Sequence, residues 1–323
     1  MSKNVPRKHH YVPVFYLANF TPSGQKDDLL YVHDIERRQS RQMTPKSIAF
    51  QKGYNTLQVE ESLSEFFEGP AANVIREILK TGELPVREDF VVLMMFLLSL
   101  AVRVPIVRDY EAGMDARNIK EHLHYLAEHD PEELAERVES LRDAGIKLPD
   151  DISAEILSSI DWTKFSVEFP VQWHMLNMID LLGVDMHLLT ERQWILNIAE
   201  DGAGDFICSD KPVIAHPLAT KRFRQIRFIR PDFQKDTIVV MPLSRRMALT
   251  GEFKKERSGS ADVDAKRVAL INGFLAAPAE FTTPKEGKHV MRYIYSPASD
   301  FSWWMPSGKV GNLTDLWASL PKR

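Results

Sequence analysis

Cysteine is almost absent from this sequence, because Cys208 is the single one among 323 residues. One cysteine cannot form a disulfide within the chain and cannot build a cysteine-rich metal site, so we expect a reducing compartment. Long hydrophobic runs are also missing. The longest apolar stretch, residues 90–102, is well short of the roughly 20 residues that cross a bilayer. The sequence therefore predicts no membrane partner, and that stretch is expected to form a buried helix.

Neither sign of charge dominates the sequence. Lysine and arginine number 41 against 45 aspartates and glutamates, a formal net charge of −4, so any basic surface must be local. Hydrophobic residues make up 44% and charged residues 27%, which excludes disordered, collagen-like and membrane-embedded classes. Residues 1–20 lack the continuous apolar stretch of a secretion signal, and we therefore predict a cytoplasmic protein.

Hydrophobic spacing divides the chain into a helical part and a mixed part. Apolar residues three or four apart predict helices at 59–80, interrupted at Gly69-Pro70, and at 90–102, 109–129, 130–145 and from near Pro170. A period near two predicts strands at 186–189, 192–199, 206–208, 237–241, 247–251 and 289–295, and a helical pattern returns at 262–276. Residues 11–20 and 29–34 are also strand-like, and we expect them to pair with the C-terminal sheet.

These patterns predict an α+β fold. The N-terminal and central part is expected to be largely helical, and the C-terminal part to hold a mixed or antiparallel β-sheet. We expect one unit over residues 1–323, with a soft internal division near 143–151.

Four short motifs, far apart in the sequence, point to one family. They are His9-His10-Tyr11-Val12-Pro13 with Tyr16-Leu17 and Phe20, then Arg103-Val104-Pro105, then Phe206-Ile207-Cys208-Ser209-Asp210-Lys211-Pro212-Val213, and finally Pro242-Leu243-Ser244. This set resembles a large, mainly bacterial family catalogued only as a domain of unknown function. The sequence departs from the family at Lys211, where asparagine or histidine is common. The resemblance implies a related fold and candidate positions, and it names no reaction.

The first candidate site combines His9, His10, Arg103 and Asp210 as catalytic residues. An imidazole can act as acid or base near neutral pH, an arginine fork can bind phosphate, and an aspartate can orient a histidine or hold a cation. The leading hypothesis is therefore a hydrolase acting on a phosphate-containing substrate such as nucleic acid. The structural alternatives are histidines that dock the N-terminus, a buried pair between Arg103 and a carboxylate, and an Asx-turn at Asp210.

A second candidate site lies in the helix expected at residues 109–129. Arg117, Asn118 and His122 form an Arg-Asn-x-x-x-His pattern, which resembles the motif of the helical HEPN ribonucleases. That resemblance implies metal-independent cleavage of RNA, in which the histidine moves a proton and the arginine stabilises the charged phosphate. The alternative is an ordinary polar helix whose charged face is solvated.

The densest run of positive charge lies at residues 221–230. Basic residues alternate there with aromatic and aliphatic ones, and they are Lys221, Arg222, Arg224, Arg227 and Arg230. A strand of this kind can contact nucleic-acid phosphates and bases, which makes a non-enzymatic module binding nucleic acid or an acidic protein a further alternative. The structural alternative is an edge strand with one charged face. Trp303-Trp304 is expected to pack against the fold.

Common cofactor motifs are missing from the sequence. It contains no Gly-x-Gly-x-x-Gly, no phosphate-binding loop ending in Gly-Lys-Ser/Thr and no His-Glu-x-x-His. The corresponding classes are disfavoured, and the identity of any cofactor or metal and the oligomeric state stay open. Nucleic acid is the candidate partner.

Overall fold

The chain forms two compact units. The computed structural model describes residues 8–159, 165–170, 173, 185–218, 233–253, 258–276, 281–282, 288–289, 293–305 and 307–320. Unit 1 combines Met1–Val104 with Met178–Arg323, and unit 2 is the intervening segment Pro105–Asn177. Helices dominate the first half of the chain and strands the C-terminal part, which confirms the predicted α+β fold. The division near 143–151 stays a prediction, and those residues lie inside unit 2.

The helices of unit 1 continue through a proline that we expected to interrupt them. They are α2 (Leu57–Ser62), the π-helix η2 (Leu63–Glu68), α3 (Gly69–Thr81) and α4 (Arg87–Val102). The predicted interruption at Gly69-Pro70 is wrong, because Gly69 keeps right-handed helical backbone angles and its N–H donates to the Ser64 carbonyl. This π turn replaces the regular α ladder at the proline, which has no N–H to donate. A Cβ at Gly69 would lie 3.1 Å from the Ser64 oxygen, so the turn favours glycine.

The predicted buried helix at residues 90–102 is confirmed as part of α4. From Leu93 to Val102 all but one of its residues are buried. Among the described residues, no single helix is long and apolar enough to cross a membrane. Within the same described residues, α4 and α5 (Pro105–His129), taken together across the break between them, meet that criterion of length and composition.

The N-terminal motif forms a short strand and a helix, so the strand predicted at residues 11–20 is wrong. β1 (Lys8–His10) pairs antiparallel with β4 (Phe50–Lys52), and α1 (Val14–Ala18) follows it. Pro13 holds φ at −60° immediately before α1, a value that suits the start of a helix. The motif therefore buries its apolar side chains from a helix.

A second strand prediction also fails. Residues 186–189 lie within a helical stretch, residues 185–190. A short apolar run fits a strand or a buried helix equally well, and only its neighbours in space decide between them.

Two larger sheets, one of five strands and one of four, lie in the described part of unit 1. The order of the first is β10-β5-β9-β8-β7, with β5 (Gln193–Ala199), β7 (Ile214–Pro217), β8 (Thr237–Pro242), β9 (Met247–Glu252) and β10 (Gly259–Val263). The order of the second is β3-β2-β13-β6, with β2 (Leu30–Asp34), β3 (Gln39–Met43), β6 (Cys208–Ser209) and β13 (Tyr293–Ser296). β10 runs parallel to β5, and the other neighbours in these two sheets are antiparallel.

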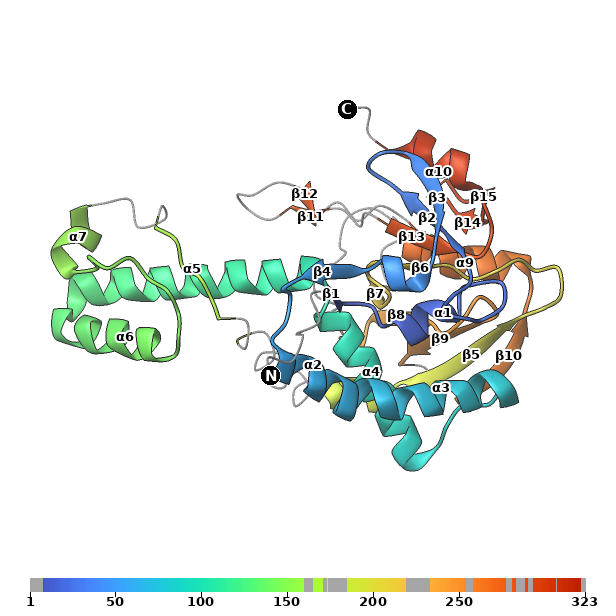
Figure 1. Ribbon diagram of the computed structural model, residues 1–323, viewed down its shortest axis with the longest axis horizontal. Coiled ribbons are helices and arrows are strands. Elements are labelled where there is room, and N and C mark those ends of the chain that lie inside the picture. The colour runs from blue at the N-terminus through green and yellow to red at the C-terminus, as the bar shows by residue number, and fades with distance from the viewer. Residues whose placement is uncertain are drawn as a thin grey trace, which may run out of the picture. The chain divides into compact units, whose positions relative to one another are not determined.

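The second sheet joins the two ends of the chain. β2 pairs with β13, which places His33 opposite Ile294 and confirms that residues 29–34 pair with a C-terminal strand. Figure 1 shows β2 and β3, from near the start of the chain, beside β13.

One hydrophobic core of unit 1 joins the first sheet to α9 (Ala265–Ala276). Buried side chains of α9, such as Ile271, pack with Val240 from β8 and Trp303 from the C-terminal segment. Trp303 is fully buried and its indole N–H donates to the Asn312 carbonyl at 2.9 Å, which confirms that it packs. The remaining elements are η1 (Pro45–Ser47), β11 (Phe281–Thr282), β12 (Lys288–His289), β14 (Trp303–Trp304), β15 (Val310–Gly311) and α10 (Leu313–Ser319).

A glycine on β9 makes room for a core tryptophan. A Cβ at Gly251 would lie 2.8 Å from the ring of Trp194, which is fully buried. Gly251→Ala is therefore expected to lower the free energy of unfolding by about 1–3 kcal/mol, as overpacking does. Gly259→Ala is the control, because a Cβ there meets nothing within 4 Å. Urea denaturation measures both, and equal stabilities of the two variants would contradict the prediction.

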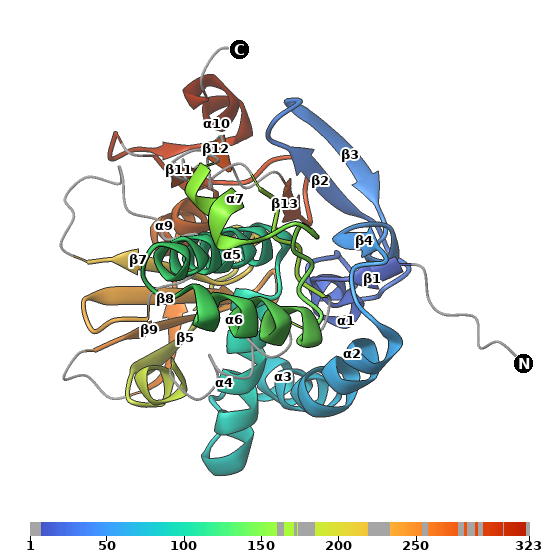
Figure 2. The ribbon, with the colours of Figure 1, turned by 90° about the vertical axis from the view of Figure 1, so that its left-hand side faces the viewer.

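Unit 2 is a small helical unit built from α5, α6 (Pro131–Asp143) and α7 (Ala154–Ser159). The predicted start at Asp130-Pro131 is confirmed, because the Asp130 side chain accepts the Glu133 N–H and the proline occupies the first turn. Figure 2 shows α5 and α6 side by side. The apolar side chains between them form a core of their own. The helix predicted from Pro170 lies largely outside the described residues.

Candidate functional site

The two predicted histidines of β1 lie in different surroundings. His9 is buried, and its Nδ1 accepts the backbone N–H of Asn55 at 2.8 Å. His10 is half-buried, with Nε2 3.3 Å from the Lys46 carbonyl oxygen and its ring 5.6 Å from that of Phe50. Burial lowers the pKa of His10 below 6.5, and the contact with the Lys46 carbonyl opposes that shift. Burial therefore favours the uncharged form of His10.

Arg103, at the end of α4, is held by the protein itself. Its Nε donates to the Tyr11 carbonyl at 2.8 Å, and its Nη1 donates to Glu68 at 2.9 Å. The Tyr54 hydroxyl donates to the Arg103 carbonyl at 2.7 Å. The Arg103 side chain is only 6% exposed. The structural alternative, a pair between Arg103 and a carboxylate, is therefore present, and Glu68 is the partner.

Asp210 follows β6 and pairs with the neighbouring strand. Its N–H donates to the Tyr293 carbonyl at 3.1 Å, and its Oδ2 accepts the Tyr293 N–H at 3.2 Å. Burial, together with the charge of Asp210, raises the pKa of the Tyr11 hydroxyl well above its ordinary value. Asp210 therefore lies near the Tyr11 side chain, while Arg103 binds the Tyr11 backbone.

Tyr11 thus links three of the sequence motifs. Tyr11 belongs to the His9 motif, Arg103 donates a hydrogen bond to its carbonyl, and the charge of Asp210 raises the pKa of its hydroxyl. These contacts join β1 to α4 and to the β6–β13 pair. The predicted residues therefore belong to one neighbourhood within unit 1, but His9 and Arg103 are both buried in it. No group of three or more histidine, cysteine, aspartate or glutamate side chains suited to a metal occurs among the described residues.

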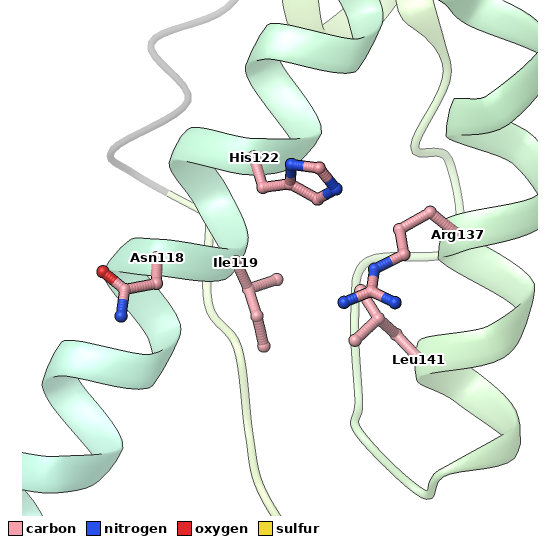
Figure 3. A pocket seen from close by; sticks show the side chains of 5 residues that line it. All are labelled: Asn118, Ile119, His122, Arg137 and Leu141. Atoms are coloured by element: carbon pink, nitrogen blue, oxygen red, sulfur yellow. The ribbon is translucent and has the colours of Figure 1, made fainter.

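The second predicted site borders a pocket within unit 2. The pocket has a volume of about 320 Å³ and lies between α5 and α6, lined by Asn118, Ile119, His122, Arg137 and Leu141. Figure 3 shows the His122 ring and the Arg137 guanidinium extending toward one another from the two helices, with Ile119 and Leu141 beside them. Both polar side chains belong to exposed residues. The pocket therefore offers an imidazole and a fixed positive charge to a ligand from solvent.

Of the predicted residues Arg117, Asn118 and His122, two line the pocket. Asn118 and His122 line it, one helical turn apart on α5, whereas Arg117 is not among the lining residues. The sequence interpretation missed Arg137. Its spacing from the buried Leu134 and Leu141, three and four residues away, places it on the face of α6 that carries those leucines. This spacing in the sequence could have identified Arg137 as a residue near the apolar face of α6.

The basic residues Lys221, Arg222, Arg224, Arg227 and Arg230 lie outside the described residues. The binding function assigned to them stays a prediction.

Comparison with known proteins identifies a family that covers most of the chain. Residues 8–288 match a family described as protein of unknown function, DUF4238. The matched segment begins at β1 and ends at the first residue of β12, and it includes all of unit 2. No curated protein and no solved structure matches the chain. The match confirms the expected resemblance to a family of unknown function, and the individual motifs assigned to that family stay a prediction.

Proposed function

Because the chain belongs to the DUF4238 family, whose description names no activity, we propose a function from the geometry of unit 2. The protein binds a phosphodiester substrate such as RNA in the pocket between α5 and α6 and cleaves it without requiring a metal. The observation that supports this proposal is that His122 and Arg137 extend toward one another across that pocket.

The two side chains supply complementary chemistry. An imidazole can accept a proton near neutral pH, so His122 takes the proton of the ribose 2′-hydroxyl. The 2′-oxygen then bonds to phosphorus, the bond from phosphorus to the 5′-oxygen breaks, and that oxygen takes a proton from water. The products are a 2′,3′-cyclic phosphate and a 5′-hydroxyl end. Arg137 donates N–H groups to the phosphate oxygens, on which negative charge increases during the reaction.

A hydrolase site at His9, His10, Arg103 and Asp210 is the second candidate. The observation that favours it is that Arg103 donates to the Tyr11 carbonyl while Asp210 lies near the Tyr11 hydroxyl. Burial of His9 and Arg103 weighs against access by a large substrate, which is why the exposed pocket of unit 2 is the first candidate.

We also propose a cytoplasmic location, which rests on the single cysteine.

Cleavage of a labelled RNA oligonucleotide tests the proposed function. His122→Gln is expected to lower the cleavage rate about 100-fold, which is typical for loss of an acid–base group. Arg137→Gln is expected to lower it about tenfold or more, because it removes a charged donor to phosphate. The products of the unmodified protein are expected to carry cyclic phosphate ends, as mass spectrometry would show.

Two matched controls make this test specific. His129→Gln changes another exposed histidine of α5, whose ring stacks on Tyr125, and it is expected to leave the rate unchanged. An oligonucleotide with deoxyribose at every position is expected to resist cleavage, because it lacks the attacking hydroxyl. Equal rates in the His122→Gln variant and the unmodified protein would remove His122 from the mechanism, and absence of any RNA cleavage would remove the proposed function.

A further inference from the structure

Four buried residues and the partly exposed Glu68 meet in a cluster of unit 1 that we call the Tyr11 junction, formed by His9, Tyr11, Tyr54, Glu68 and Arg103. The connections are direct. Arg103 donates to the Tyr11 carbonyl and to Glu68, and its own carbonyl accepts the Tyr54 hydroxyl. The Tyr11 and Tyr54 rings meet edge to face, 6.3 Å apart. The junction is therefore one packed network that ties β1 to the end of α4.

His9 presents a buried donor to this junction. The His9 Nδ1 accepts the N–H of Asn55, the residue after Tyr54. A neutral imidazole carries one proton, so the proton of His9 must be on Nε2, and that atom is a donor. His9 is 2% exposed, and among the described residues nothing accepts the Nε2 proton.

Arg103 presents a second buried donor. Its Nε and Nη1 have partners, but Nη2 is buried and contacts no acceptor in the described part of the chain. A guanidinium can only donate, because it has no acceptor atom and does not lose its proton in proteins. Buried donors of this kind are rarely left without an acceptor in folded proteins, because the hydration that they lose must be replaced.

Both groups therefore call for the same kind of ligand. A group that only accepts hydrogen bonds, and that carries negative charge beside an arginine, satisfies both donors, and phosphate and carboxylate oxygens are such groups. We propose that the Tyr11 junction is a binding site for a small oxyanion, an inorganic phosphate or a short carboxylate, held by the Nη2 of Arg103 and the Nε2 of His9. The small size follows from burial, because His9 is 2% exposed and Arg103 8%. This site is in unit 1 and is independent of the function proposed for unit 2.

Ligand-induced stabilisation of the full chain tests the site. Thermal unfolding is followed during titration with inorganic phosphate and, separately, with acetate, at constant ionic strength. A saturable rise of the melting temperature is expected for one of the two ions, because a ligand that binds only the folded state stabilises it. The ion that gives the tighter response identifies the oxyanion. The titrations use the His122→Gln/Arg137→Gln variant, so that phosphate bound between α5 and α6 does not contribute.

Three substitutions in that background locate the response. Arg103→Lys keeps the positive charge beside Glu68 but removes Nη2, and His9→Asn keeps an acceptor for the Asn55 N–H but removes the Nε2 donor. Each is expected to weaken anion binding about tenfold or more, the effect of losing one charge-assisted hydrogen bond. Lys80→Gln removes an exposed charge of unit 1, 75% accessible and paired with Glu77, and is expected to leave binding unchanged.

Two results would overturn the proposal. The first is the absence of a saturable response to either ion in the His122→Gln/Arg137→Gln variant with His9 and Arg103 intact, which would leave water as the partner of both donors. The second is a response of unchanged affinity in His9→Asn and in Arg103→Lys, which would place the anion elsewhere. If Arg103→Lys prevents folding, the His9→Asn variant decides the test, because it keeps the contact to the Asn55 N–H.

Discussion

Replacing Arg192 by methionine is expected to lower the free energy of unfolding by about 4 kcal/mol or more, because several buried carbonyls lose a charged donor. Arg192 is 2% exposed. Its Nη1 donates to the carbonyls of Thr237 at 2.6 Å and Gly251 at 3.2 Å, and its Nη2 to those of Phe233 at 2.5 Å and Gln234 at 2.8 Å. Methionine fills a similar length of space but donates nothing, so these oxygens stay buried without that partner.

The geometry explains why the position requires arginine. The guanidinium lies with its carbon 4.6 Å from the centre of the Phe253 ring and reaches the start of β8 and the end of β9 at the same time. A lysine has three donors on one nitrogen and cannot reach acceptors on two sides. Arg192→Lys is therefore expected to recover about half of the lost stability, since each hydrogen bond to a charged group contributes roughly 1.5–3 kcal/mol.

Urea denaturation followed by tryptophan fluorescence measures these effects, with the buried Trp194 two residues away as a reporter. Arg37→Met is the matched control. Its side chain is 63% exposed and its Nε lies 4.0 Å from the Asp34 Oδ2, so the change is expected to stay within about 0.5 kcal/mol. A loss of equal size in Arg37→Met and Arg192→Met would show that the buried network contributes no special stability.

Acidification from pH 6.5 to 4 is expected to destabilise unit 1 through His33. This histidine of β2 is fully buried, and burial lowers its pKa from 6.5 to about 4, while the charge of Asp300 opposes the shift. Its ring nitrogens lie 2.7 Å from the Ser40 hydroxyl and 2.6 Å from that of Ser296, whose own proton goes to the Ala298 carbonyl. The Ser296 oxygen therefore accepts from His33, and the network fits a neutral ring.

The sign of the pH dependence follows from proton binding. Between pH 6.5 and 4 the unfolded chain protonates His33 and the folded chain does not, so stability falls as the pH falls through this window. The contribution is fully present above pH 6.5 and is lost by about pH 4, below which both states are protonated. The difference of 6.5 − 4 = 2.5 pKa units corresponds to about 3 kcal/mol at 1.36 kcal/mol per unit.

The free energy of unfolding, measured at several pH values across that window, checks this expectation. In His33→Gln the part of the slope that comes from His33 is expected to disappear, although the variant is less stable near neutral pH. Ser40→Ala is the control, because it removes one hydrogen-bond partner and keeps the titrating ring, so the slope is expected to persist. A difference in stability between the parent and His33→Gln that does not vary with pH would contradict the assignment.

Several elements could be predicted because their cause is local in the sequence. Asp130-Pro131 begins α6 through an N-cap and a proline that suits the first turn. The apolar stretch at residues 90–102 is helical because it is too long for an ordinary strand and is apolar on all sides. The alternating pattern predicted strands at 237–241 and 247–251, and the bounds of β8 and β9 agree with these to within one residue.

The failures share a different cause. Residues 11–20 and 186–189 are short apolar runs, and their own pattern does not distinguish a strand from a helix. The continuous helix across Gly69-Pro70 depends on a π turn, a local geometry that hydrophobic spacing does not reveal. In each case the rest of the fold, and not the local pattern, decides the conformation.

The candidate sites divide in the same way. His9, Arg103, Asp210 and His122 were found from residue type and local motif alone. Their partners were not, because the Glu68 that pairs with Arg103 lies 35 residues away, and Arg137 belongs to the next helix. His33 and Arg192 were missed entirely, since a single histidine or arginine in an apolar stretch carries no pattern.

The sequence by itself determined the class of fold, the main helices and strands, and the residues able to carry chemistry, because periodicity, capping and side-chain type act over a few neighbouring residues. The tertiary structure alone decided which of those residues are buried, which carbonyls Arg192 reaches and which cation faces His122. Burial and hydrogen-bond partners depend on segments far apart in the chain, so they exist only once the chain has folded.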